Sequence, residues 1–324
     1  MKSENLVFKV ISKITSFQKV LLIVHENPDG DTLASASALY QVLIKLGKHP
    51  SMVCKDLVPR PFLFLPKIRE IHNDMLFGDY EAIIVIDCGD LRRTGFDIRL
   101  KEFARKKRFI INIDHHPKND LHKIATLNFF DQAVSSTAEL VWEIIENMDI
   151  EIDKDMATAL LTGLYTDTGG FKHSNTTSKT LKIAAELMKY GARIRLITKN
   201  VSLNKTVPAM KLWGLVLSRL HRNSEFRIVS SVITQNDLID CNASQDDIAG
   251  VVNLMNTIPD SKAAILFFET EDGKIRASMR TEHEAVDLSR LATIFGGGGH
   301  KKASGFTIDG KLAIEKDSWK IVLK

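Results

Sequence analysis

Short apolar runs alternate with longer stretches of helical spacing through the first half of the chain. Apolar residues three and four positions apart predict helices over Leu33–Leu46, Ser136–Asn147 and Met156–Tyr165. Several of the short runs are apolar at consecutive positions, as strands are when helices cover both faces of a parallel sheet. The pattern predicts an α/β domain with a doubly wound, mostly parallel sheet. The predicted strands are Val20–Val24, Met52–Cys54, Ala82–Ile86, Phe109–Ile113 and Thr126–Phe129.

The hydrophobic pattern changes in the second half of the chain. Residues 176–220 show successive helical stretches, and the region after them predicts a smaller, mixed α/β domain. A chain of 324 residues is about twice the usual single-domain length. We expect a first domain over residues 1–185, a helical linker over 186–222 and a second domain over 223–324. The predicted strands of the second domain are Arg227–Ile233, Ala263–Glu269 and Ile275–Arg280, and its predicted helices are Asp246–Met255 and Leu288–Phe295.

The composition of the chain limits the kinds of ligand that it is expected to bind and the cellular compartment in which it is expected to occur. The net charge of +4 is compatible with a small anionic ligand but too weak to indicate binding to long duplex nucleic acid. Cys54, Cys88 and Cys241 lie far apart, which predicts neither a disulfide framework nor a thiolate zinc site. No apolar run approaches the roughly 18–20 residues of a membrane span, and the N-terminus lacks a secretory apolar segment. These features predict a cytoplasmic protein without a membrane anchor.

Acidic and imidazole side chains directly follow three predicted strands and one predicted helix. The strands are Val20–Val24, Ala82–Ile86 and Phe109–Ile113, and the helix ends near Tyr165. In open α/β sheets, ligands bind beyond the carboxyl ends of the strands, so we expect these side chains to converge there. They are His25, Asp29, Asp31, Asp87, Asp114, His115, His116 and Asp167.

This set of side chains indicates a metal site. Five carboxylates in one site would repel one another and take up protons unless cations neutralise them. Oxygen ligands with some imidazole and no thiolate suit Mn²⁺ or Mg²⁺, and the imidazole favours manganese. Two such cations about 3.5–4 Å apart can share a hydroxide and stabilise an in-line phosphoryl displacement. Pro28-Asp29-Gly30-Asp31 alone is typical of a turn and a helix N-cap, but the joint occurrence at one sheet edge favours metal binding.

Four of these motifs occur in order and resemble the DHH phosphoesterase superfamily. They are His25-x-x-Pro28-Asp29-Gly30-Asp31, Asp87, Asp114-His115-His116 and the segment Gly163–Gly169. The resemblance implies that one metal is held by His25, Asp29 and Asp87. It implies a second metal at Asp31, Asp87, His115 and Asp167, with Asp87 bridging the two. His116 is then expected beside the scissile phosphate, with Asp114 orienting the neighbouring histidine.

A glycine run near the C-terminus carries a second resemblance. Gly296–Gly299 is followed by His300-Lys301-Lys302-Ala303-Ser304-Gly305 and preceded by Arg276-x-Ser278-x-Arg280. Consecutive glycines let backbone N–H groups approach an anion closely, although four glycines alone are also typical of a flexible turn. The whole stretch resembles the substrate-binding domain of one DHH subfamily. That resemblance implies substrate contacts from Arg280, Ser278, Gly297, Gly298, Gly299 and His300.

The two resemblances together imply a stand-alone phosphodiesterase of the oligoribonuclease type. Its expected substrates are short 5′-phosphorylated oligonucleotides and dinucleotides such as pApA, cleaved to mononucleotides, with cyclic di-AMP a substrate of some members. A 3′-phosphatase acting on pAp and a non-catalytic nucleotide-binding sensor remain open as alternatives. The sequence ranks none of pApA, cyclic di-AMP, pAp and short RNA above the others. It is compatible with a homodimer but does not determine the oligomeric state.

Overall fold

The computed structural model describes residues 2–75, 79–203, 205–315 and 318–323. The chain divides into two units, Met1–Asn204 and Lys205–Lys324. Helix α8 (Ile194–Val201) belongs to the first unit and helix α9 (Val207–Ser218) to the second. Within the described ranges, no helix is long and apolar enough to cross a membrane.

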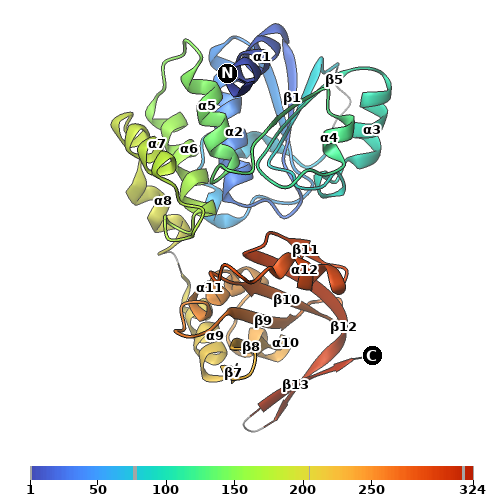
Figure 1. The fold of residues 1–324 in the computed structure, drawn as a ribbon, viewed down its shortest axis with the longest axis vertical. Coiled ribbons are helices and arrows are strands. Elements are labelled where there is room, and N and C mark those ends of the chain that lie inside the picture. Colours follow the sequence, from blue (N-terminus) through green and yellow to red (C-terminus); the bar gives the residue numbers. More distant parts are fainter. Residues whose placement is uncertain (1, 76–78, 204, 316–317, 324) are drawn as a thin grey trace. The chain divides into compact units, whose positions relative to one another are not determined.

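Six parallel strands form the sheet of the first unit, in the order β3-β2-β1-β4-β5-β6 (Figure 1). The order reverses between the neighbours β1 and β4, and this reversal confirms the predicted doubly wound α/β fold. Such a reversal opens a crevice at the carboxyl ends of the two strands. The strands are β1 (Lys19–Ile23), β2 (His49–Val53), β3 (Ile71–His72), β4 (Ala82–Ile86), β5 (Phe109–Asp114) and β6 (Leu127–Phe130).

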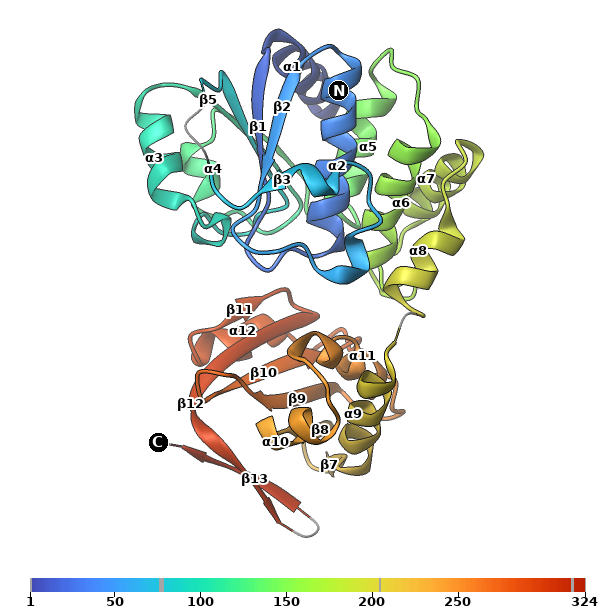
Figure 2. The same ribbon diagram turned by 180° about the vertical axis from the view of Figure 1, so that it is seen from behind.

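Alternate residues of the central strands pack against different helices. Leu22 and Ile84 belong to a core on one face of the sheet, and Leu21 and Ile83 belong to a core on the other face. Successive side chains of a strand point to opposite faces, so these strands must be apolar at every position. The first face is covered by α1 (Lys2–Ser16), α2 (Gly30–Lys45), α5 (Thr137–Glu146), α6 (Lys154–Asp167), α7 (Ser178–Lys189) and α8, and the second by α3 (Asp97–Arg105) and α4 (Leu121–Ile124) (Figure 2).

The second unit contains a mixed sheet in the order β11-β12-β10-β9-β8-β7, with β13 paired to β12. Only β8 and β9 are parallel among the described pairs, and the other neighbours are antiparallel. The predicted smaller mixed α/β domain is confirmed. The strands are β7 (His221–Asn223), β8 (Ile228–Ile233), β9 (Ala263–Glu269), β10 (Lys274–Arg280), β11 (Gly298–Gly299), β12 (Ala303–Glu315) and β13 (Ser318–Leu323).

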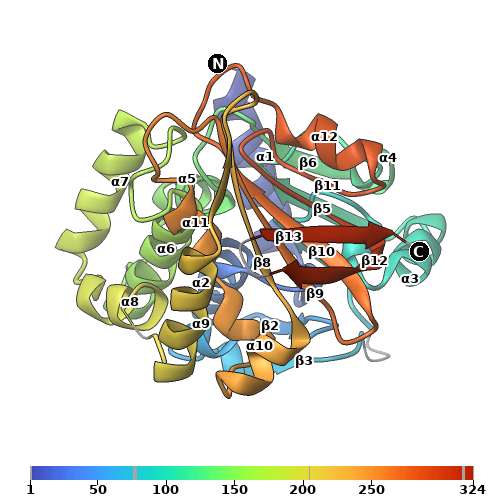
Figure 3. The same ribbon diagram turned by 90° about the horizontal axis from the view of Figure 1, so that it is seen from below.

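Helices cover both faces of this second sheet (Figure 3). Helices α9, α10 (Gln235–Asp240) and α11 (Val251–Met255) pack on one face, and α12 (Leu288–Ile294) packs on the other. The predicted helix Asp246–Met255 is in fact two elements, a 3₁₀ turn over Gln245–Ile248 and α11. Gly250 separates them with φ +97°, a left-handed conformation that glycine adopts without steric cost.

Candidate metal centre

His25 lies just beyond β1, with 1% of its surface exposed. Its Nδ1 lies 2.7 Å from the carbonyl oxygen of Glu26, to which the protonated nitrogen donates. Nε2 lies 3.7 Å from Asp29 Oδ2 and 4.0 Å from Asp87 Oδ2. The guanidinium Nη2 of Arg93 is 3.2 Å from the same Nδ1. His25 therefore presents Nε2 to two acidic side chains of the site.

Asp29 and Asp31 are placed by the start of helix α2. Asp29 is the N-cap, and its Oδ1 accepts the backbone N–H groups of Asp31 at 3.1 Å and Thr32 at 3.2 Å. Asp31 is buried and accepts the backbone N–H groups of Thr137 at 2.6 Å and Ala138 at 3.0 Å. These two amides begin helix α5, where the helix dipole favours an anion. A buried carboxylate is thus stabilised as an anion by the end of a neighbouring helix.

Asp87 lies at the carboxyl end of β4, beside the point where the strand order reverses. Its side chain is buried, and Oδ1 accepts a hydrogen bond from the hydroxyl of Thr137 at 2.8 Å. The same Oδ1 lies 3.5 Å from His115 Nε2. The backbone φ of Asp87 is 56°, in the left-handed region that aspartate tolerates better than most residues. Asp87 therefore faces His25 with one oxygen and His115 with the other.

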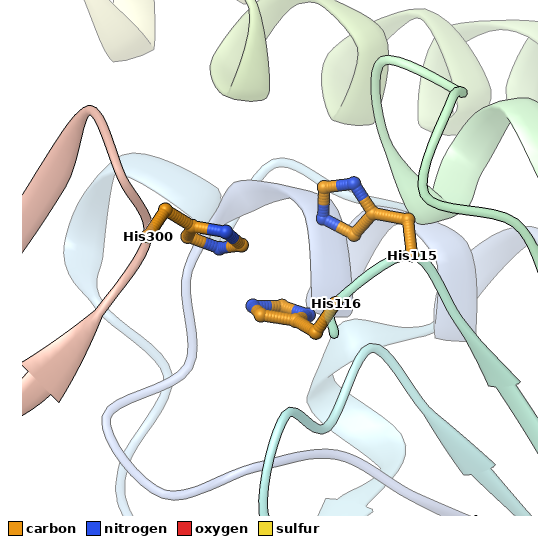
Figure 4. Close-up of side chains that lie close together, drawn as sticks. All are labelled: His115, His116 and His300. Atoms are coloured by element: carbon orange, nitrogen blue, oxygen red, sulfur yellow. The ribbon is translucent and has the colours of Figure 1, made fainter. Parts of the chain in front are cut away.

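The Asp114-His115-His116 segment lies at the end of β5, and its two imidazole rings meet edge-on with centroids 4.8 Å apart (Figure 4). His115 Nε2 lies 3.7 Å from Asp167 Oδ2 as well as 3.5 Å from Asp87. His116 instead turns its Nδ1–H to Asp114 Oδ1 at 2.8 Å, and its backbone N–H donates to the same oxygen at 3.0 Å. His115 therefore faces two acids of the site, while His116 lies 3.5 Å from Asp87 Oδ1 and is held by the buried Asp114.

Asp167 is the last residue of α6, and close helix packing brings it to the site. Helix α6 can approach α2 and α5 because residue 163 is glycine. A Cβ at that position would lie 2.5 Å from Ala138 Cβ and 2.6 Å from Asp31 Oδ1. The absence of a side chain at Gly163 therefore makes room for the Asp31 carboxylate.

The electrostatics of these acids fit bound cations. Burial, together with the charges of Asp31 and Asp29, raises the pKa of both Asp87 and Asp167 well above the usual carboxyl range. Burial also raises the pKa of Asp31. A divalent cation at these oxygens would replace the mutual repulsion by attraction and keep the carboxylates ionised. The donor set, carboxylate oxygen and imidazole nitrogen without thiolate, suits Mn²⁺ or Mg²⁺.

The structure brings all eight predicted side chains of the first unit together. Candidate ligand atoms lie within 4.8 Å of one another in each of three groups. Our sequence reasoning missed Thr137, Ala138 and Arg93, which contact Asp31, Asp87 or His25. Ser136-Thr137-Ala138-Glu139 does match a helix-capping pattern. That pattern predicts where a helix begins, but it does not predict which side chains contact the beginning of the helix. The three groups are His25 with Asp29 and Asp87, Asp31 with His115 and Asp167, and Asp87 with Asp114 and His116.

The predicted substrate contacts of the second unit gather at one end of its sheet. Arg280 pairs with Ala303, and Ser278 pairs with Gly305, which in turn pairs with Gly298. Burial lowers the pKa of the Arg280 guanidinium. His300, labelled in Figure 4, occupies the tight turn between β11 and β12.

Strand packing gives part of the glycine run a structural role of its own. A Cβ at Gly297 would meet the carbonyl oxygen of Gly305, and one at Gly299 would lie 2.6 Å from that of Ala303. The backbone N–H of His300 donates to the Ala303 carbonyl at 2.8 Å, which closes the turn. Gly297 and Gly299 are therefore needed for the close approach of this segment to β12, whereas a Cβ at Gly296 or Gly298 would meet nothing within 4 Å.

Comparison with known proteins gives consistent matches over both units. The DHH family, N-terminal domain, matches residues 19–164, and the DHHA1 domain matches residues 227–317. The "Bifunctional oligoribonuclease and PAP phosphatase NrnA" of Thermus thermophilus is 30% identical over 293 residues, 90% of this chain and 84% of that protein. The protein of the same name from Mycoplasma genitalium is 28% identical, over 94% of this chain and 93% of its own length.

A solved structure shares the fold of almost the whole chain. An exopolyphosphatase-related protein from Bacteroides fragilis has a TM-score of 0.87 and 24% sequence identity. The match covers 95% of this chain and 92% of that protein.

Proposed function

The chain belongs to the DHH family, and from this premise we propose that it is a metal-dependent phosphodiesterase that cleaves short 5′-phosphorylated oligonucleotides to mononucleotides. The observation that carries the proposal is the pair of ligand groups at the carboxyl edge of the first sheet, with Asp87 facing both. The names of the relatives, which combine oligoribonuclease and PAP phosphatase, support the class of substrate. A complete set of acids and imidazoles disfavours a sensor without catalysis.

We assign the candidate ligands to two divalent cations, most suitably Mn²⁺. His25, Asp29 and Asp87 would hold one cation, and Asp31, His115 and Asp167 would hold the other, with Asp87 shared. When bound, such a pair would supply Lewis-acid polarisation of the phosphate and lower the pKa of a coordinated water below that of bulk water. The position of His25 supports its role, since Nε2 faces the two acids of its group. The hydrogen bonds from Thr137 and Ala138 support a charged Asp31.

The remaining residues of the motif orient and hold the substrate in this proposal. His116 is fixed through Nδ1 by Asp114, so Nε2 is the nitrogen that can donate to an oxygen of the scissile phosphate. Asp114 accepts the Nδ1–H of His116 and keeps its ring from rotating. In the second unit, Arg280, Ser278, the amides of Gly297, Gly298 and Gly299, and His300 would bind the phosphate groups and the base of the nucleotide.

Chromatographic analysis of products across a substrate panel tests the proposal. The panel contains pApA, RNA of three to five nucleotides, single strands of twenty nucleotides, cyclic di-AMP, pAp and inorganic pyrophosphate, each with Mn²⁺ present. We expect kcat/KM to be highest for 5′-phosphorylated dinucleotides and to fall at least about tenfold by ten nucleotides, about 1.4 kcal/mol. The net charge of only +4 supports this limit, because a long single strand is bound by an extended basic track. Steady or rising rates on twenty nucleotides, or turnover of pyrophosphate alone, would contradict it.

A further inference from the structure

Behind Asp114, three buried polar atoms have no hydrogen-bond partner within the described part of the chain. They are Asn112 Oδ1, Asp114 Oδ2 and His122 Nε2. Asn112 and Asp114 are fully buried and two positions apart on β5, so both face the side of the sheet that α4 covers. Their register partners on β6 are Asn128 and Phe130. A buried polar atom without a partner is costly, which indicates that something else satisfies these three.

His122 of α4 lies over the same two strand pairs. Its ring meets the ring of Phe130 edge-on, with centroids 4.8 Å apart, and its carbonyl oxygen accepts the Asn128 Nδ2–H at 3.2 Å. Burial lowers the pKa of His122, against the opposing charge of Asp114, which favours a neutral ring. The backbone N–H of Asn119 donates to His122 Nδ1 at 3.3 Å. The ring proton is therefore on Nε2, which makes that unpartnered atom a donor.

The orientations of the two amide groups follow from the same contacts. Because the His122 carbonyl can only accept, Asn128 must present Nδ2 to it and Oδ1 to its neighbour. Asn112 then donates its Nδ2–H to Asn128 Oδ1 at 3.2 Å, and its own Oδ1 is left as an acceptor. The three unpartnered atoms are thus two acceptors and one donor.

We propose that Asn112, Asp114 and His122 bind one internal water molecule, and that this water holds Asp114 in the orientation that positions His116. A water donates two hydrogen bonds and accepts at least one, which matches the set: it donates to Asn112 Oδ1 and Asp114 Oδ2 and accepts from His122 Nε2–H. The other oxygen of Asp114 already accepts both N–H groups of His116. His122 is then a positioning residue for His116, and this role rests on the proposed function. Partners behind a catalytic histidine fix its tautomer and ring orientation.

Two substitutions of His122 separate the hydrogen bond from the packing. His122→Phe keeps a ring against Phe130 but removes the Nε2–H donor, whereas His122→Gln keeps an amide donor. With pApA and Mn²⁺, we expect His122→Phe to lower kcat about tenfold with KM within about twofold, and His122→Gln to restore most of the loss. Lys123→Ala, an exposed change on the same helix, is the control and should leave both constants unchanged. An unchanged kcat in His122→Phe, or equal losses in the two His122 variants, would overturn the proposal.

A spectroscopic measurement on the full chain decides the water site independently of turnover. With ¹⁵N-labelled histidine, long-range ¹H–¹⁵N spectra report which ring nitrogen carries the proton. We expect His122 to be protonated at Nε2, and the His116 Nδ1 proton to be observed in the native protein and in His122→Gln but shifted in His122→Phe. A proton on His122 Nδ1 would refute the water site at any level of activity. A native protein with this spectrum that hydrolyses nothing in the panel would instead contradict the proposed function alone.

Discussion

Asp87 is the residue on which the candidate metal centre depends most. Its oxygens lie 4.0 Å from His25 Nε2 and 3.5 Å from His115 Nε2, so among the described contacts it is the one acid that faces both of these candidate ligands. Its left-handed backbone, φ 56°, suits asparagine as well as aspartate. Asparagine at this position therefore removes the charge while keeping the shape of the side chain and its backbone conformation.

We expect Asp87→Asn to lower kcat/KM for pApA at least about 100-fold, about 2.7 kcal/mol in barrier height, because a neutral amide cannot bridge two cations. Steady-state kinetics with Mn²⁺ measure the effect. Asp90→Asn, on the same loop but outside the site, is the matched control and should stay near the native rate. A rate for Asp87→Asn within about threefold of native would show that Asp87 is not the bridge.

The raised carboxyl pKa values predict an unusual pH dependence for the metal-free protein. The pKa of Asp87 and that of Asp167 are raised above the ordinary value of 3.8, so in the window above that value the folded state binds more protons than the unfolded state. Their contribution to the free energy of unfolding is therefore present at low pH and is lost as pH rises through the folded pKa. Bound Mn²⁺ needs ionised carboxylates and should reverse the trend.

Thermal unfolding of chelated protein between about pH 5 and 8 measures this contribution. It is the free energy of unfolding of the native protein minus that of Asp87→Asn at each pH. We expect the chelated native protein to lose stability relative to Asp87→Asn as pH rises. With saturating Mn²⁺, the native protein should instead gain stability relative to Asp87→Asn as pH rises. A difference that does not vary with pH in the absence of metal would mean that Asp87 is not destabilised by its buried, acidic surroundings.

At the scale of elements, the site exists where helix ends meet strand ends. The N-terminus of α5 meets Asp31 and Asp87, and α6 passes close enough to bring Asp167 to the same place. The contact between α6 and its neighbours depends on Gly163, since a Cβ there would crowd Asp31 and Ala138. A methyl group at residue 163 should therefore affect packing and metal binding together.

We expect Gly163→Ala to cost about 1–3 kcal/mol of stability, as overpacking of a tight core does, and to reduce the rise in melting temperature that Mn²⁺ produces. Gly214→Ala in α9 is the control, because nothing lies within 4 Å of a Cβ there. In that helix interior, alanine should stabilise by up to about 1 kcal/mol. Thermal unfolding with and without Mn²⁺ distinguishes Gly163→Ala from Gly214→Ala. Equal changes in stability and in the Mn²⁺-induced rise in melting temperature would contradict the crowding of Asp31.

The elements that the sequence predicted are those with strong apolar patterns. The strands β1, β4 and β5 and the acids at their ends could be read directly, because buried parallel strands are apolar at every position. Helices α3 and α4 and strand β3 were not predicted, since they are short or polar. The contact of Thr137 with Asp87 joins residues 50 positions apart, and local spacing carries no signal for it. Gly250 broke a predicted helix because its backbone is left-handed there.

At the scale of the whole molecule, the candidate metal ligands and the proposed substrate contacts lie in different units. The candidate metal ligands all belong to the first unit, and the proposed substrate contacts Arg280 and His300 belong to the second. Substitutions in the second unit should therefore weaken substrate capture without changing the bound metal.

We expect Arg280→Ala to raise KM for pApA about tenfold, because a charge-assisted contact to phosphate is lost, while the manganese content stays at the native value. Arg276→Ala on the same strand and face is the control, with an exposed side chain. Kinetics and elemental analysis on the same preparations give both quantities. Loss of manganese in Arg280→Ala would show that the second unit contributes to metal binding and not to substrate binding alone.

The central claim is that paired divalent cations at the edge of the first sheet carry out phosphodiester hydrolysis. A manganese titration of chelated full-length protein tests it most directly, with bound metal measured by elemental analysis and pApA hydrolysis measured in the same samples. We predict no turnover without metal, a maximum near about two Mn²⁺ per chain, and weaker restoration by Mg²⁺. Full activity of the metal-free protein in excess EDTA would contradict the account.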